Sequence, residues 1–211
     1  MSTGDVGDTS HLLHSLLSRL RLPWLLRHHQ RIGVLAVFSA LNAFLSMLLI
    51  GTLAALTHSS LIFPSLGPTA FLFFYTPRAP SASPRNAILG HALGCGAGYF
   101  SLWVTGLLGA PQSLADMTVW RGVCAALALA LTAAGMILCR APHPPAAATT
   151  LIVALGILTR PIQLLVVLAG VVLLTVQALA TNRLVGLNYP LWAPPCEPLP
   201  HPEAPPVCDI E

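Results

Sequence analysis

The sequence predicts an all-α membrane protein, in which four full transmembrane helices and two broken or re-entrant helical segments form a two-fold internal repeat. Of the 211 residues, 55% are hydrophobic and 8% are charged, which is far outside the composition of soluble domains. Four apolar stretches are long enough to cross a bilayer. Two shorter stretches share one sequence pattern and lie at corresponding places in the two halves of the chain, which predicts the repeat.

The four long stretches cover residues 33–58, 86–109, 118–139 and 162–183. A bilayer core about 30 Å thick needs about 20 residues of helix, so each stretch can span it. These stretches divide the chain into three regions. We predict a cytoplasmic amphipathic segment over 1–32, a transmembrane domain over 33–188 with repeats at 33–110 and 111–188, and a Pro-rich tail over 189–211.

The ends of the chain carry signals for its orientation. Leucines gather on one helical face of residues 11–31, which predicts a segment lying in the headgroup plane. Four arginines precede the first long stretch, namely Arg19, Arg21, Arg27 and Arg31. Because cytoplasmic flanks are rich in basic residues, we expect a multi-pass protein of the cell membrane with both termini in the cytoplasm.

Two short segments, residues 63–75 and 141–158, begin with prolines and small residues and continue as apolar runs. Proline is tolerated in the first turn of a helix, where its missing N–H would have no helical acceptor. Both segments are therefore predicted to be helices that begin inside the membrane. Pro68 and Pro144 hold matching places in them, 144 − 68 = 76 positions apart.

The number of membrane crossings depends on what these two segments do. If each crosses completely, the chain crosses six times and its halves are inverted, so Arg78, Arg85 and Arg140 join the amino-terminal arginines. If each dips and returns, the chain crosses four times and those arginines lie outside. The distribution of positive charge favours six crossings, whereas the shortness of the first segment favours four. Both arrangements stay open.

The start of a helix at membrane depth is a place where an anion can bind. It presents unpaired N–H groups and the positive end of the helix dipole, equivalent to about half a unit charge. Between residues 33 and 188 the one carboxylate is Asp116, against six arginines. The counter-charge must come from lipid phosphates or a bound solute. We expect two partners, the lipid bilayer and a small inorganic anion bound near the midplane.

The candidate substrate-binding residues come from both broken segments and the helix between them. They are Ser65, Gly67, Thr69, His143, Ala146, Thr149, Thr150, Arg85 and His91. Each also has a structural interpretation. The prolines can simply kink helices while the hydroxyls bond to carbonyls one turn back. Arg85 can anchor to lipid phosphates, His91 can be a structural histidine, and His143 can cap a helix as readily as it couples protons.

Other classes of function are disfavoured by the same residues. The formal charge of +3 is too small and dispersed for a nucleic-acid partner. No CxxC pair is present, so we predict neither metal nor cofactor, although Cys196 and Cys208 leave a metal site in the tail open, with His201. With one carboxylate in the core, carboxylate-based catalysis is excluded and we predict no enzyme. A dyad of Ser65 and His91 stays open.

Three of these motifs resemble those of the HPP family of integral membrane proteins, which is named after a tripeptide. They are His143-Pro144-Pro145 with the three alanines after it, the run from Pro64 to Ala70, and Pro84-Arg85-Asn86 leading to Gly90-His91. The resemblance extends from about Gly33 to Gly186. It implies a four-helix membrane protein, and it implies a nitrite-like substrate because plastid and cyanobacterial relatives are associated with nitrite transport.

We therefore predict a transporter or channel for a small inorganic anion, with nitrite as the first candidate. The alternative is a structural or regulatory membrane subunit without transport activity of its own, which would dock through small-residue faces. We interpret Gly90, Gly94 and Gly98 as a face that packs the bundle. Small-residue faces turned to lipid would also allow copies of the chain to associate, so we expect a homo-oligomer. Channel or carrier behaviour and proton coupling stay open.

Overall fold

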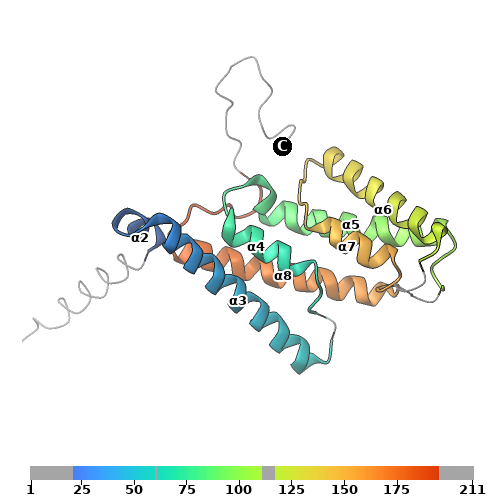
Figure 1. Ribbon diagram of the computed structural model, residues 1–211, viewed down its shortest axis with the longest axis horizontal. Helices are drawn as coiled ribbons and strands as arrows, with labels where there is room; N and C mark the ends of the chain where they lie inside the picture. The colour runs from blue at the N-terminus through green and yellow to red at the C-terminus, as the bar shows by residue number, and fades with distance from the viewer. Residues whose placement is uncertain (1–20, 60, 111–116, 195–211) are drawn as a thin grey trace, which may run out of the picture.

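The computed structural model describes residues 21–59, 61–110 and 117–194, and every regular element in these ranges is helical (Figure 1). Four helices are long and apolar enough to cross a membrane. They are α3 (Arg31–Thr57), α5 (Pro84–Val104), α6 (Val119–Leu138) and α8 (Pro161–Leu184). The prediction of an all-α fold with four full-length apolar helices is confirmed. The expected segment over 11–31 is described only from residue 21 on, where it forms α2 (Leu22–His28).

The helix ends follow local sequence signals. Helix α5 begins at Pro84, because proline suits the first turn of a helix. Ser83 caps the helix: its hydroxyl accepts a hydrogen bond from a backbone N–H of the first turn. The same helix was expected to reach residue 109 but ends at Val104. Gly106 has a φ of +70°, a left-handed conformation that ends helices.

The two broken segments form short helices, α4 (Leu66–Tyr75) and α7 (Ala146–Ala154). Each follows a stretch without helical structure that contains proline, as the sequence predicts. Helix α7 is shorter than the apolar run to residue 158, because Gly156 has a φ of +84° and reverses the chain. A 3-10 turn, η1 (Pro80–Ala82), lies between α4 and α5.

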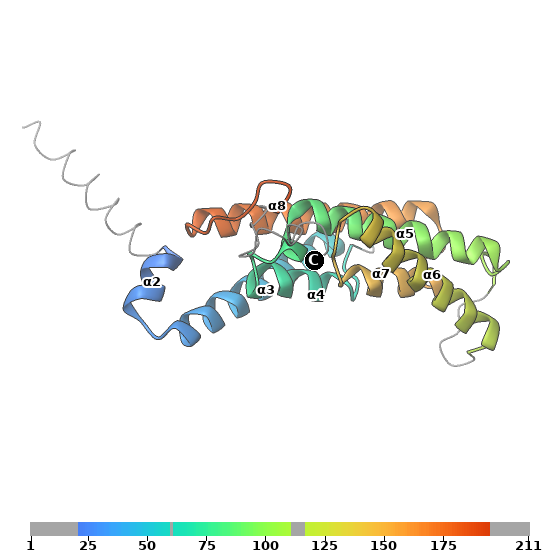
Figure 2. The same cartoon turned by 90° about the horizontal axis from the view of Figure 1, so that it is seen from above.

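The helices pack as two groups of three that meet along α5 and α8. Helices α3 and α4 pack with α8, while α6 and α7 pack with α5. Each broken helix thus rests on a long helix from the other half of the chain. Figure 2 shows α4 and α7 on the same face of the layer that α5 and α8 form. This exchange is what a two-fold repeat would produce, and the repeat itself stays a prediction.

Contacts between helix termini define one end of the bundle. The N–H of Leu22 donates to the carbonyl of Val185 after α8 (2.9 Å), and the N–H of Arg85 donates to the carbonyl of Trp192 (3.0 Å). The guanidinium of Arg85 donates to the carbonyl of Arg140 after α6 (2.8 Å). The start of α2 therefore meets the end of α8, and the start of α5 meets the end of α6 and the residues that follow α8. We call this the arginine-rich end.

The opposite end gathers the remaining termini of the second group. The indole N–H of Trp120 donates to the carbonyl of Thr105 (2.8 Å), so the end of α5 meets the start of α6. A Cβ added to Gly156 would lie 2.8 Å from Nη1 of Arg121, which places the end of α7 there as well. Residues 155–160 then lead directly into α8.

The direction of α4 decides the number of passes. The side chain of Asn182, near the end of α8, donates to the carbonyl of Phe73 (3.1 Å), and Ser39 in α3 donates to the carbonyl of Phe74 (2.9 Å). Helix α4 therefore ends toward the arginine-rich end, and Figure 1 shows α4 and α7 running apart from the middle. The described chain passes between the two ends six times, in four full helices and two broken segments.

Candidate functional site

The starts of the two broken helices meet through their hydroxyl groups. Ser65 is the residue before α4, and Thr149 lies in the first turn of α7. The hydroxyl of Thr149 donates to Oγ of Ser65 over 2.7 Å. The sequence predicts that both segments begin at membrane depth, and the structure brings these two predicted site residues into direct contact.

Two histidines complete this contact into a continuous network. His91 in α5 lies with Nδ1 2.7 Å from the hydroxyl of Thr149 and Nε2 2.9 Å from the hydroxyl of Thr69. His143, before α7, places Nε2 3.3 Å from the same Thr69 hydroxyl, and the two imidazole ring centroids are 5.0 Å apart. We call Ser65, Thr69, His91, His143 and Thr149 the histidine–threonine cluster.

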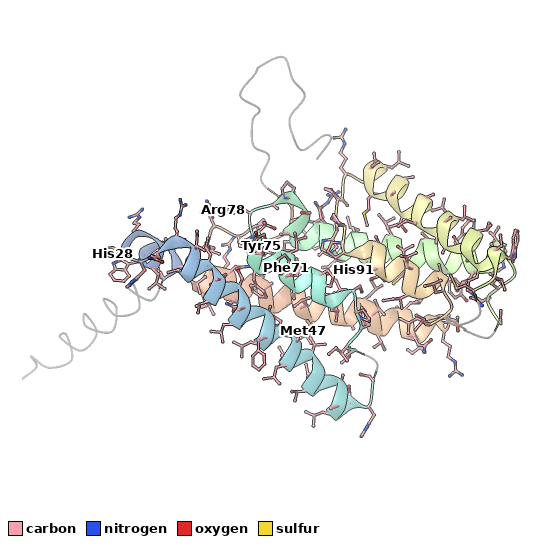
Figure 3. The ribbon with its side chains drawn as sticks, viewed as in Figure 1. His28, Met47, Phe71, Tyr75, Arg78 and His91 are labelled. Carbon is pink, nitrogen blue, oxygen red and sulfur yellow. The ribbon has the colours of Figure 1, made fainter. Side chains whose placement is uncertain are left out.

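The cluster is closed to solvent and central in the molecule. Each of its five side chains belongs to a residue with 0% exposure. Figure 3 shows His91 in the middle of the bundle, between the two ends. None of residues 21–59, 61–110 and 117–194 is Asp or Glu, whereas every arginine except Arg19 lies in these ranges. The cluster is therefore a buried polar site in a cationic, apolar bundle.

The glycines of α5 bring α7 close enough to form the cluster. A Cβ at Gly90 would lie 2.7 Å from Cβ of His143, and one at Gly94 would lie 2.8 Å from Oγ1 of Thr150 and 2.9 Å from a backbone carbonyl. Gly98 meets Val153 in the same way, at 2.7 Å. The interpretation of these three glycines as a packing face is confirmed.

Thr150 and Ala146 lie beside the cluster and connect it to α6. The hydroxyl of Thr150 donates to the carbonyl of Ala146 (3.1 Å) and shares a hydrogen bond of 2.8 Å with the hydroxyl of Thr132. Thr132 was not predicted, because its place in a run of small apolar residues gives no signal for a polar contact. Gly67 faces away, since a Cβ there would meet nothing within 4 Å.

Arg85 has a role that the sequence does not indicate. Its guanidinium donates to the carbonyls of Arg140 (2.8 Å) and Cys139 (2.9 Å), which follow α6. A cation at that position stabilises the negative end of the helix dipole. Arg85 is thus bonded to helix α6, a contact between residues 55 positions apart, rather than to the histidine–threonine cluster.

The first backbone N–H groups of both broken helices are bonded to protein carbonyls. Leu66 donates to Phe63 (3.1 Å), and Ala146 donates to His143 (3.0 Å). The next two N–H groups of α7 are bonded in the same way. His143 therefore caps α7 through its carbonyl, while its ring joins the cluster. Hydroxyl and imidazole side chains provide the contacts where the two helices meet.

The arrangement bears on catalysis and metals as well. The hydroxyl of Ser65 contacts Thr149, which lies between it and His91, so the geometry does not form a direct serine–histidine dyad. Within the described residues no group of three His, Cys, Asp or Glu side chains could hold a metal. Cys95 and Cys124 are buried free thiols, and Cys196, Cys208 and His201 lie outside the described residues.

Two grooves lie on the outside of the bundle, away from the cluster. The first, of about 610 Å³, is lined by apolar residues of α2, α3 and the end of α8, with His29 and Gln30 at its edge. The second, of about 380 Å³, lies between α5 and α6 and is lined by Leu93, Gly96 and Leu131, among others. Neither groove is lined by a residue of the cluster.

Comparison with known proteins gives one match. A family model described as the transmembrane region of HPP proteins matches residues 29–190. No curated protein matches the chain, and no solved structure matches it. The matched range includes all of the helices from α3 to α8 and every residue of the cluster.

Proposed function

The chain belongs to the HPP family, and from that membership we propose that it moves a small inorganic anion across a membrane, with nitrite as the first candidate substrate. The family and the four long apolar helices support a multi-pass, transporter-like membrane protein. Nitrite is proposed from the family, and the binding site is proposed from the chemistry of the cluster.

One observation carries the proposal: two broken helices begin at a shared, fully buried polar cluster. Broken helices that meet near the midplane form the substrate sites of many transporters. Polar side chains are costly at membrane depth, and they are usually turned toward a substrate path or a partner. Here three hydroxyls and two imidazoles contact one another between the two ends of the bundle.

A small anion would bind by replacing contacts within the cluster. Ser65 and Thr149 each have a hydroxyl proton that can be donated to an anion instead of to a neighbour. The dipoles of α4 and α7 point their positive ends toward the same place. Because none of the five cluster residues is exposed in this structure, we propose a carrier, in which the starts of α4 and α7 separate to admit the anion from one side at a time.

Flux measurements on the purified protein in liposomes test this function. We expect uptake of nitrite, with nitrate and formate as competing anions. Thr149→Val should reduce uptake at least tenfold. Thr175→Val is the matched control, because Thr175 is buried in α8 and its hydroxyl bonds within its own helix (2.7 Å). If the parent moves none of the three anions above the level of protein-free liposomes, the proposed function is wrong.

We further propose that the arginine-rich end faces the cytoplasm. It holds Arg21, Arg27, Arg31, Arg78, Arg85, Arg140 and Arg183, whereas Arg121 and Arg160 lie at the opposite end. Basic residues are concentrated on the cytoplasmic side of membrane proteins. A fluorescent protein that matures only in the cytoplasm should therefore fluoresce when it is fused after residue 211. Activity only from a reporter that matures outside the cytoplasm would contradict this orientation.

A homo-oligomer and a role as a subunit are both tested by purification. Helix α6 turns small residues outward, among them Ala126, Ala130 and Ala134, and such faces let membrane helices approach closely. We propose that copies of the chain associate there, and cross-linking of Ala130→Cys would detect it. A stoichiometric second protein, together with no flux from this chain alone, would instead favour the structural or regulatory subunit.

A further inference from the structure

The hydrogen-bonding partners of the two histidines determine which ring nitrogens carry protons. Nδ1 of His143 lies 2.7 Å from the carbonyl of Ser81, and a carbonyl only accepts, so Nδ1 is the donor. Nδ1 of His91 lies 2.7 Å from Oγ1 of Thr149, whose own proton is donated to Ser65. Nδ1 of His91 is then a donor as well. In neutral rings, both Nε2 atoms carry lone pairs.

These two lone pairs converge on one hydroxyl group. Oγ1 of Thr69 is 2.9 Å from Nε2 of His91, 3.3 Å from Nε2 of His143 and 3.0 Å from the carbonyl of Ser65. All three partners are acceptors when the rings are neutral, yet the hydroxyl has one proton to donate. Two of the three contacts are therefore unsatisfied, at a buried site where an unmade hydrogen bond is costly.

A single added proton relieves this conflict. On either Nε2 atom it turns an acceptor into a donor, so that ring donates to Thr69 and the hydroxyl proton serves one of the remaining acceptors. The proton can pass between the rings through Thr69, because the hydroxyl accepts from one ring while it donates to the other. The longest contact, 3.3 Å to His143, is the one we expect to shorten.

The added proton brings a positive charge that the described residues do not neutralise. The elements packed around the two imidazole rings place neutral groups beside them. They contribute Thr69 and Phe73 from α4, the carbonyl of Ser81 in η1, Gly90 from α5, and Thr149 and Ala146 from α7. No other titratable group among the described residues has a contact with either ring. Arg85 precedes His91 by six positions and Arg140 precedes His143 by three. The guanidinium of Arg85 is bonded to the carbonyls of Cys139 and Arg140 after α6. An unaccompanied buried charge is costly.

We propose that the protein carries a proton together with each monovalent anion, with the Nε2 atoms of His91 and His143 sharing the proton through Thr69. The proposal rests on the proposed function and names its coupling ion. Proton and anion stabilise each other in the cluster, and this linkage is reciprocal. His91 and His143 bind the proton, and Thr69 positions it.

Transport with separately controlled gradients tests the coupling. In liposomes, a potassium gradient with valinomycin sets the potential, and buffers set the pH difference. Because one proton with one anion is electroneutral, we expect nitrite to accumulate on the alkaline side regardless of potential, with acidification of the lumen. Protein-free liposomes correct for nitrous acid that crosses the lipid unaided. Accumulation that follows the potential and ignores pH overturns the coupling but leaves anion transport standing. No flux under either gradient overturns both.

Variants assign the proton to the histidine pair. We expect His143→Gln and Thr69→Val to lose pH-driven accumulation at least tenfold, while Thr175→Val keeps it. If His143→Gln retains full pH-driven accumulation, the pair is not the proton site. Nitrogen-15 NMR of the histidine-labelled parent needs no folded variant: nitrite at constant pH should convert a neutral imidazole into a doubly protonated one. An unchanged spectrum in a protein that transports nitrite overturns the assignment.

Discussion

The two broken helices are held in different ways. Helix α7 rests on α5 at three glycines spaced four residues apart, Gly90, Gly94 and Gly98, where an added Cβ would lie within 2.9 Å of another atom. Its backbone is therefore almost in contact with that of α5. Helix α4 rests on α3 and α8 through large side chains instead. Phe74, with 1% exposure, packs its ring against that of Phe38 in α3 at a centroid distance of 6.2 Å, and Gly170 is the one glycine of α8.

The difference shows which of the two helices is free to move. Close backbone packing at glycines leaves no room for sliding, since interiors are packed to crystal density. Side-chain packing allows rotamer changes at smaller cost. We infer that α7 and α5 form the fixed part of the site, and that α4 moves when the cluster opens.

The largest effect is expected at Gly94. In Gly94→Ala the new Cβ would lie 2.8 Å from Oγ1 of Thr150 and 2.9 Å from the carbonyl of Ala146, so α7 must shift. Overpacking of this kind costs about 1–3 kcal/mol, which lowers Tm by roughly 2–12 °C for a chain of this size. Thermal unfolding in detergent measures it. Gly96→Ala on the same helix, where nothing lies within 4 Å, should leave Tm unchanged or raise it, because alanine favours a helix over glycine. Equal losses would contradict the glycine contact.

The next effect is expected at the link between the two broken helices. Thr149→Val removes the hydroxyl that joins Ser65 to His91, and leaves two buried polar atoms without this partner. Such a loss costs about 1–3 kcal/mol. Thr175→Val, which breaks a bond within α8, should cost less. Thermal unfolding of both variants compares them, and a Thr149→Val protein as stable as Thr175→Val would show that the link contributes nothing.

A smaller effect is expected at Arg85. In Arg85→Met the side chain keeps an unbranched apolar part, while both hydrogen bonds from the guanidinium to the carbonyls after α6 are lost. Interaction of a partly exposed cation with a helix terminus contributes about 0.3–1 kcal/mol, so Tm should fall by roughly 1–4 °C. Arg78→Met is the control at the same end, because Arg78 is exposed. A larger loss of nitrite flux than of stability would instead place Arg85 on the anion path.

The smallest effect is expected at Gly170, the counterpart of Gly94 at the same 170 − 94 = 76 spacing. In Gly170→Ala the Cβ would lie 3.1 Å from the carbonyl of Leu61 and 3.4 Å from the flexible end of Leu66. These neighbours can give way by a few tenths of an ångström. We expect at most a third of the Tm loss of Gly94→Ala. A loss as large would show that α4 is held as rigidly as α7.

Most of the fold could be predicted from the sequence, because helix length, proline and glycine act locally. The four full helices were expected within a few residues of their ends, and only α5 ended more than one residue early, at Val104 instead of residue 109. The site was predicted in part. Ser65, Thr69, His91, His143 and Thr149 do meet, whereas Gly67 faces away and Arg85 bonds to α6.

The membrane class, the two interrupted segments and the shortage of carboxylates follow from residue types and their spacing along the chain, so the amino-acid sequence is enough to predict them. The tertiary structure alone decided the six passes, the closure of the cluster and the convergence of two lone pairs on Thr69. Those features join residues far apart, such as Ser65 and Thr149, 84 positions apart. Close packing selects such contacts, and no local pattern encodes them.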